Sequence, residues 1–209
     1  MLTVYTFGDS ILDCSHYNEC GVDPGGLLVS NDDELFPEFR GRDLSTRIPA
    51  RLEQRAFDGS IVDDLPDQAE NLAVDGPSIG LLTIGGNDLL MTLLDDRGPG
   101  IIEFERKLDH FLEALPIRPM LIGTVYDPTF GNDALNVFGV DPAWGRENLR
   151  RVNAVLAEMA RTYGFLVDLH DHFLGGRPDW FTRTIEPSLI GASEVRRCFL
   201  EVIETNGLV

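Results

Sequence analysis

Five short apolar segments, separated by polar or amphipathic stretches, most strongly limit what this 209-residue chain can fold into. Each has the length of a buried β-strand and falls well short of the ~18–20 residues of a membrane span. Strands that are apolar throughout and alternate with helices are typical of a parallel sheet covered on both faces. We therefore expect an α/β protein, a three-layer α/β/α sandwich with a five-stranded parallel sheet. The expected strands are 2–7, 55–57, 79–84, 120–125 and 165–169.

The stretches between these strands predict the helical layers. In residues 101–115, apolar side chains recur at helical spacing, which is typical of a helix with one buried face. We expect further helices at 44–54, 61–72, 142–163 and 191–203, and a long polar loop at 18–43. These elements predict one domain spanning residues 1–209, with a flavodoxin-like strand order.

Charge and cysteine content exclude several classes of protein. The chain has 35 acidic and 17 basic residues, a formal net charge of −18. This charge argues against a nucleic-acid-binding protein and against a peripheral protein of anionic membranes. The first residues lack the pattern of a signal peptide, and the three cysteines lack metal-ligand spacing. We expect a cytoplasmic protein with reduced thiols, with a Cys14–Cys20 bridge as the alternative.

Polar clusters follow all five expected strands. They are Gly8-Asp9-Ser10, Asp58-Gly59-Ser60, Gly85-Gly86-Asn87-Asp88, Asp127, and the segment from Asp168 to His172. In parallel sheets, ligand sites lie beyond the carboxyl ends of the strands. Each cluster alone is also typical of ordinary loops and helix caps. Together they predict one site at this edge of the sheet.

Three of these residues suit acyl-transfer chemistry. Ser10 would follow its strand directly and place its backbone N–H in the first turn of a helix, where N–H groups lack partners. Gly59 can bring a second backbone N–H close to a ligand, and Asn87 can supply a side-chain amide. Three such donors can form an oxyanion hole, and removing one typically costs ~2.7–4 kcal/mol of barrier lowering.

The chain resembles the SGNH or GDSL hydrolases, which are serine esterases and lipases on a three-layer α/β/α fold. Phe7-Gly8-Asp9-Ser10-Ile11-Leu12-Asp13 is similar to the block that carries the nucleophile, and Gly85-Gly86-Asn87-Asp88 to the block with the oxyanion asparagine. Ala56-Phe57-Asp58-Gly59-Ser60 resembles the block with the oxyanion glycine. Asn71–Gly76 also resembles that block, but Gly76 leaves too few residues for a crossover helix before the third strand. The resemblance implies hydrolysis of a small-molecule ester without a cofactor or metal.

The last family block differs in this chain. Where the family has Asp-x-x-His-Pro, Arg183 stands in place of the aspartate and Glu186 in place of the histidine, followed by Pro187. An unperturbed glutamate, with a pKa near ~4.3, is a weaker base than a histidine near ~6.5 unless burial raises its pKa. Arg183 would lower that pKa, and the two residues could instead form only an ion pair. We therefore consider both Glu186 and His172 as the general base.

Other residues complete the expected site. His170 and His16 are weaker alternatives to His172 for the base. Asp9, Asp88 and Arg183 are expected to contact substrate. Five aromatic residues in predicted loops could line an apolar pocket: Tyr17, Phe36, Phe39, Trp180 and Phe181.

Two other functions fit the same residues. The chain could be a binding protein that has lost turnover together with the histidine of the last block. It could also be a metal-dependent phosphatase, because Mg²⁺ prefers carboxylate oxygens. The ligands would then come from Asp9, Asp13, Asp88, Asp127 and Asp168.

Overall fold

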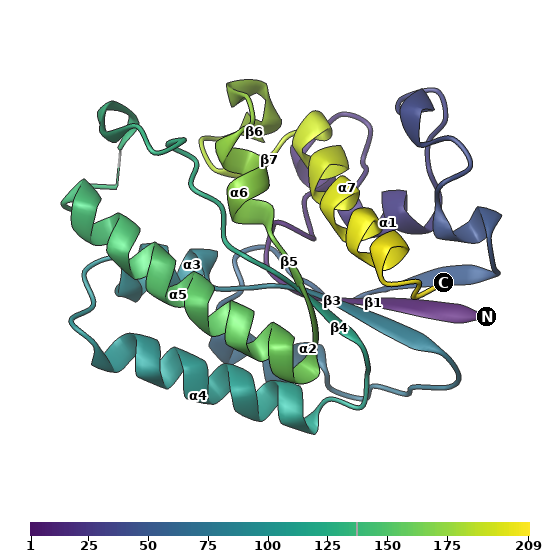
Figure 1. Ribbon diagram of the computed structural model, residues 1–209, viewed down its shortest axis with the longest axis horizontal. Helices are drawn as coiled ribbons and strands as arrows, with labels where there is room; N and C mark the ends of the chain where they lie inside the picture. Colours follow the sequence, from purple (N-terminus) through teal and green to yellow (C-terminus); the bar gives the residue numbers. More distant parts are fainter. Residues whose placement is uncertain (137) are drawn as a thin grey trace.

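A five-stranded parallel sheet forms the centre of the computed structural model, which describes residues 1–136 and 138–209 (Figure 1). The strand order is β2-β1-β3-β4-β5, and each neighbouring pair is parallel. This is the flavodoxin-like order, so the predicted fold class is confirmed. The strands are β1 (Leu2–Gly8), β2 (Ala50–Gln54), β3 (Ser78–Thr83), β4 (Met120–Gly123) and β5 (Gly164–Val167).

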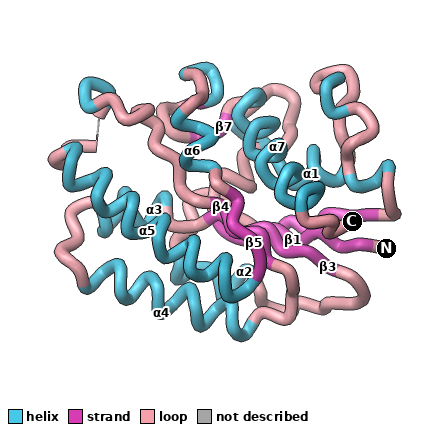
Figure 2. Tube along the Cα trace, in the orientation of Figure 1, coloured by secondary structure: helices cyan, strands magenta, loops and turns pink. Residues whose placement is uncertain are grey.

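Helices cover both faces of this sheet, as Figures 1 and 2 show. Alternate side chains of β1 enter two separate cores: Tyr5 and Phe7 pack on one face, Leu2 and Val4 on the other. The first core includes α4 (Pro99–Ala114) and α5 (Pro142–Tyr163), and the second includes α1 (Pro24–Val29) and α7 (Leu189–Thr205). The remaining helices are α2 (Leu65–Gln68), α3 (Gly86–Asp88) and α6 (Leu169–Leu174).

The two longest predicted helices form close to their expected bounds, because their sequences carry both start signals and one apolar face. Proline occupies the first turn of α4 and of α5, where its missing N–H costs nothing. Asp141 caps α5 by accepting a hydrogen bond from the backbone N–H of Trp144. The apolar residues of α4 that recur at helical spacing are buried against the sheet.

The region around β2 differs from the prediction. Residues 44–54 were expected to be helical, but a 3₁₀ turn at Leu44–Thr46 is followed by β2, an edge strand. Leu2 lies opposite Ala50 in the register, and this long-range pairing overrides the helical propensity of the charged residues. The helix expected at 61–72 is reduced to a 3₁₀ turn and α2. The loop expected at 18–43 contains α1, which Asp23 caps.

Two further elements position the site. The short strands β6 (Phe181–Thr182) and β7 (Glu186–Pro187) form an antiparallel hairpin that precedes α7.

Cys14, Cys20 and Cys198 are free thiols, so the alternative Cys14–Cys20 bridge is not formed. Within the described part of the chain, no helix has the length and apolar character required to cross a bilayer.

Candidate active site

Ser10 lies at the carboxyl end of β1, in a tight turn that starts at Asp9. The carbonyl of Asp9 accepts hydrogen bonds from the N–H groups of Leu12 and Asp13, both at 3.1 Å. This is a single turn and not the longer helix expected after Ser10. Gly8 precedes it with a φ of +112°, and a Cβ at Gly8 would stand 1.7 Å from the Thr83 carbonyl oxygen. Only glycine therefore allows β1 to turn here and present Ser10.

The loop that carries Gly59 is attached directly to the Ser10 turn. The Phe57 N–H donates to the Gly8 carbonyl at 3.0 Å, and the Asp58 N–H donates to Asp13 Oδ2 at 2.9 Å. Gly59 has a φ of +82°, which favours glycine. Among the described residues, the backbone N–H groups of Ser10 and Gly59 have no acceptor. Both N–H groups are therefore available to an oxyanion.

Asn87 comes from the third strand end and joins the same arrangement. Its Nδ2 donates to the Ser60 carbonyl at 3.0 Å, which fixes the amide beside the Gly59 loop. An amide nitrogen carries two hydrogens, so one stays free for a ligand. Ser10 and Asn87 also line one cavity. Gly76, the alternative glycine, lies just before β3, at the amino ends of the strands and therefore away from Ser10 at their carboxyl ends.

Glu186 approaches Ser10 from β7. Burial raises the pKa of the half-buried Glu186 carboxyl above its usual range, and the nearby Ser10 hydroxyl lowers it in part. Nearby Asp58 also raises this pKa, whereas His16 and Arg183 lower it. Glu186 Oε2 is buried and has no hydrogen-bond partner among the described residues. A buried carboxylate oxygen without a partner can accept a proton from a neighbouring group.

The turn between β6 and β7, which positions Glu186, has a strained backbone. Arg183 and Thr184 adopt φ angles of 46° and 80°, which are unusual for residues other than glycine. The Tyr126 hydroxyl donates to the Ile185 carbonyl at 2.7 Å and fixes the end of the turn. Arg183 is exposed and makes no ion pair with Glu186 within the described residues, so the ion-pair interpretation is wrong.

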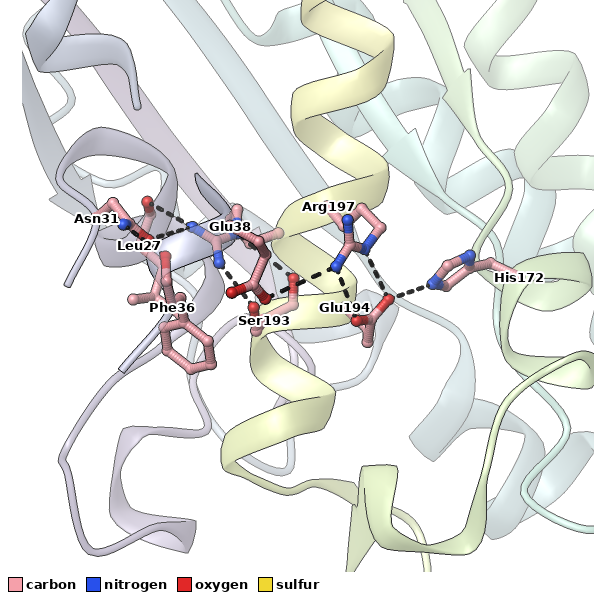
Figure 3. A network of polar contacts seen from close by, with 9 residues as sticks. Leu27, Asn31, Phe36, Glu38, His172, Ser193, Glu194 and Arg197 are labelled. Carbon is pink, nitrogen blue, oxygen red and sulfur yellow. Dashed lines mark hydrogen bonds and ion pairs between the residues drawn. The ribbon is translucent and has the colours of Figure 1, made fainter. Parts of the chain in front are cut away.

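The structure does not bring His172 to Ser10. His172 Nε2 lies 2.8 Å from Glu194 Oε2 on α7, and the ring stacks on Trp180. Figure 3 shows the imidazole aimed at Glu194, which also binds Arg197. His170 Nδ1 contacts the Val125 carbonyl at 3.2 Å.

His16 contacts the loop that carries Gly59. His16 Nε2 lies 3.1 Å from Asp58 Oδ2, and its charge affects the pKa of Glu186. Among the proposed bases, Glu186 is the one whose pKa the Ser10 side chain affects.

The aspartates at the strand ends serve separate structural tasks. Asp9 accepts hydrogen bonds from Thr83 Oγ1 and the Ile11 N–H, and burial raises its pKa to about 7. Asp88 binds the Val62 N–H with both oxygens, and burial raises its pKa to about 6. Asp127 and Asp168 likewise accept from N–H groups of the residues that follow them.

The positions of these aspartates bear on the phosphatase alternative and on the residues expected to contact substrate. The described residues contain no group of three acidic, histidine or cysteine side chains that could hold a metal ion. The strand ends therefore lack the converging carboxylates that the phosphatase alternative requires. Of the three residues expected to contact substrate, Asp9 forms part of the cavity wall, whereas Asp88 and Arg183 do not line it.

An apolar cavity of about 110 Å³ opens beside Ser10 and Asn87. Its wall comes from the segments after β3 and β4 and from the start of α5. Leu89 and Leu90 belong to η5 (Leu89–Leu93), a π-helical turn of a kind often found at functional sites. The apolar lining includes Leu89, Leu90, Leu94, Val125, Tyr126, Leu149 and Ile185.

None of the five aromatic residues expected in this wall lines the cavity. Phe36 and Phe39 pack around the buried guanidinium of Arg196, and Trp180 stacks on His172. Phe181 packs on Tyr126, whereas Tyr17 lies under Arg183. The segment 89–94 was overlooked because its apolar residues were not distinguishable from ordinary core positions.

Comparison with known proteins places this arrangement in context. The model of the GDSL-like lipase/acylhydrolase family matches residues 6–189. A comparison with curated proteins gives no match.

Solved structures with similar folds include two hydrolases. The acetylxylan esterase Axe2 from Geobacillus stearothermophilus has a TM-score of 0.69 at 22% identity, over 96% of this chain and 93% of that chain. LAE5, an alpha/beta hydrolase from the metagenome of Lake Arreo in Spain, has a TM-score of 0.67 at 21% identity, over 97% and 94%. At these identities the likeness supports the fold alone.

Proposed function

Because this chain belongs to the GDSL-like lipase/acylhydrolase family, we propose that it hydrolyses carboxylic esters with Ser10 as the nucleophile. One observation carries the proposal: Ser10 and Asn87 line the same apolar cavity, and the backbone N–H groups of Ser10 and Gly59 have no acceptor among the described residues. The family supports a hydrolase, and the roles of the individual residues are our inference from this geometry.

In the first step, Ser10 Oγ attacks the ester carbonyl carbon while its proton passes to the Glu186 carboxylate. The carbonyl oxygen becomes an oxyanion, held by the N–H groups of Ser10 and Gly59 and the free N–H of Asn87. When the C–O bond breaks, Glu186 returns the proton to the departing alkoxide, so the products are an alcohol and an acyl-enzyme.

The second step repeats this chemistry with water. Glu186 takes a proton from a water molecule, whose oxygen attacks the acyl carbon of the Ser10 ester. The same three donors hold the second oxyanion. Collapse releases the carboxylic acid, and the proton on Glu186 returns to Ser10 Oγ, which restores the starting state.

Glu186 can act as a base because its surroundings raise its pKa. Burial moves the pKa upward, toward the operating pH at which a general base is most efficient. Arg183 and His16 act in the opposite direction and favour the ionised carboxylate. One carboxylate could thus do the work that a histidine does in the usual family pattern.

The cavity favours esters with an apolar acyl group. Its walls beside Ser10 are mostly aliphatic, and such a surface gains from burying the methylene groups of a substrate by ~0.8 kcal/mol each. The polar side chains in its lining are those of Asp9, Ser10, Asn87, Asp127, Thr129, Asn136 and Arg146.

The test is hydrolysis of p-nitrophenyl butyrate by wild type and by Ser10→Ala. We expect kcat to fall at least about 1,000-fold, since the nucleophile is lost. A fluorophosphonate should label wild type at Ser10, located by peptide mass spectrometry. Equal rates for both proteins would contradict the assignment. Inactivity on a broad ester panel, with a ligand-dependent rise in Tm, would favour the binding-protein alternative instead.

A chelator provides a second check on the same reaction. Activity that survives EDTA is expected of the serine mechanism, whereas loss of activity on chelation would support the metal-dependent alternative.

A further inference from the structure

Tyr17 contacts two loops that are far apart in the sequence. It belongs to the 3₁₀ turn η1 (Ser15–Tyr17), shortly after the nucleophile turn. Its hydroxyl donates to Asp58 Oδ2 at 2.6 Å, and Asp58 precedes Gly59. The guanidinium carbon of Arg183 lies 4.8 Å from the centre of the Tyr17 ring, and Arg183 belongs to the turn that carries Glu186.

We propose that Tyr17 is a positioning residue. It holds two segments in place relative to Ser10: the oxyanion loop, which is the loop that contains Asp58 and Gly59, and the Glu186 turn, which is the β6–β7 turn that leads to Glu186. Its hydroxyl fixes the loop through Asp58, and its ring fixes the turn through Arg183. This inference rests on the proposed ester hydrolysis and adds a residue that lies outside the reacting set. No ester atom needs to touch Tyr17 for the effect to operate.

Backbone strain shows why the turn needs such a contact. Arg183 and Thr184 both have positive φ angles, a conformation that costs free energy in residues other than glycine. Strained conformations persist only where surrounding contacts determine them. Tyr126 holds the end of the turn at Ile185, and the stacking of Arg183 on Tyr17 holds its beginning. Loss of the Tyr17 contact leaves the first part of the turn free to relax and to move Glu186.

The oxyanion loop is held in a comparable way. Asp58 is fixed through its N–H, which donates to Asp13, and through Oδ2, which accepts from the Tyr17 hydroxyl and contacts His16. Burial and the hydrogen bond to Asp58 raise the pKa of the Tyr17 phenol, so it stays a protonated donor at neutral pH. A protonated phenol already donating to Asp58 does not serve as a base, which leaves Tyr17 a geometric role.

A matched control exists at the other end of the sheet. The Tyr163 hydroxyl donates to Asp109 Oδ1 at 2.7 Å, and the guanidinium carbon of Arg118 lies 4.8 Å from the centre of its ring. Tyr163 ends α5 just before the amino end of β5, away from Ser10. Tyr163→Phe therefore removes an equivalent hydrogen bond at a position without a role in the proposed site.

The first experiment compares Tyr17→Phe with Tyr163→Phe on p-nitrophenyl butyrate. We expect Tyr17→Phe to lower kcat about 10-fold with KM changed less than about twofold, since a misplacement of ~1 Å can cost ~100-fold in rate. Tyr163→Phe should leave kcat unchanged, and it should lower Tm by about as much as Tyr17→Phe lowers it. A kcat of Tyr17→Phe equal to that of wild type would overturn the role of the hydroxyl.

The second experiment tests the ring contact through Arg183, which is exposed and therefore tolerant of substitution. Arg183→Gln should lower kcat with little effect on KM, and Arg183→Lys, which keeps a cation for the ring, should recover part of the loss. A raised KM at unchanged kcat would show that Arg183 binds substrate instead, and would overturn this part of the proposal.

Hydrogen exchange separates this inference from the proposed function, because it needs no substrate. In Tyr17→Leu, which removes both contacts, amides of residues 57–60 and 181–187 should exchange faster than in wild type. In Tyr163→Leu they should not. Unchanged exchange in Tyr17→Leu would refute the positioning role even in an active enzyme. A wild type that neither hydrolyses esters nor labels at Ser10 would refute the proposed function whatever the exchange shows.

Discussion

The Glu186 carboxyl lies close enough to the Ser10 hydroxyl for the serine to lower its pKa, although the two residues belong to opposite ends of the chain. Burial raises the pKa of Glu186, and the interaction with Ser10 opposes that shift only in part. A carboxylate thus stands beside the nucleophile where the family pattern has a histidine. The residue that removes the proton from Ser10 is consequently the first matter to test.

Substitutions of Glu186 and His172 distinguish the two proposed bases. Glu186→Gln keeps the size of the side chain but removes its basicity, and kcat should fall by about 100-fold or more. His172→Ala should cost stability, because the contacts with Glu194 and Trp180 are lost, and should leave kcat within a few-fold of wild type. Steady-state kinetics and thermal unfolding of both variants provide the measurement. The reverse ranking of the two kcat values would identify His172 as the base.

The pH dependence of kcat/KM should show the raised pKa of Glu186. The base works only when ionised, so activity falls as pH decreases through this pKa, and the midpoint should lie above the usual glutamate value. Arg183 lowers the pKa of Glu186, so Arg183→Gln should move the midpoint to higher pH. Asp58 raises it, so Asp58→Asn should move the midpoint to lower pH.

A control is needed because Asp9 also titrates near neutral pH. Its pKa is raised to about 7, so Asp9 could give rise to the same limb of the profile. The limb should persist in Asp9→Asn. Its disappearance in that variant would assign the titration to Asp9 and contradict the role of Glu186.

The apolar cavity predicts a preference for longer acyl chains. With p-nitrophenyl esters from acetate to octanoate, kcat/KM should rise until the cavity is filled. Leu90→Asp puts a charge into the wall and should lower kcat/KM for hexanoate much more than for acetate. Met91→Asp is the matched control, because Met91 is the next residue and is 68% exposed outside the lining. Equal effects of the two substitutions would argue that acyl chains bind elsewhere.

Asp9 predicts a loss of stability as pH rises from acidic to neutral. Burial raises its pKa from an ordinary value of 3.8 to about 7 in the folded protein, so the folded state binds more protons between these values. Stability from this group is therefore greatest at acidic pH and decreases as pH rises toward 7, by on the order of 2–4 kcal/mol. Urea unfolding at pH 5 and pH 8 measures the difference. Asp9→Asn can still accept from Thr83 and Ile11 and should reduce it; an unchanged difference would exclude Asp9 as its source.

Much of the fold followed from local sequence patterns. Short segments of sequence were enough to predict β1 and β3 from their apolar runs, and α4 and α5 from their helical periodicity. Burial of a strand on both faces, or of a helix along one side, leaves such a pattern in the sequence. β2 could not be predicted from its own sequence, because it is an edge strand that alternates charged and apolar residues and forms through pairing with β1. Short helices such as α1 and α6 carry too few turns to show a period.

The sequence by itself determined the fold class, the positions of Ser10 and Asn87 just beyond buried strands, and the absence of a histidine from the last block; the second strand, expected at 55–57, instead forms at Ala50–Gln54. Which side chain reaches Ser10 was decided by tertiary structure. His172 follows β5 closely, but α6 turns it toward Glu194, whereas a strained hairpin brings Glu186 in. The direction of a side chain and the pKa that burial gives it depend on elements far away in the sequence. No local pattern encodes that dependence, and for this reason our choice of Glu186 over His172 as the proposed base rests on the folded chain.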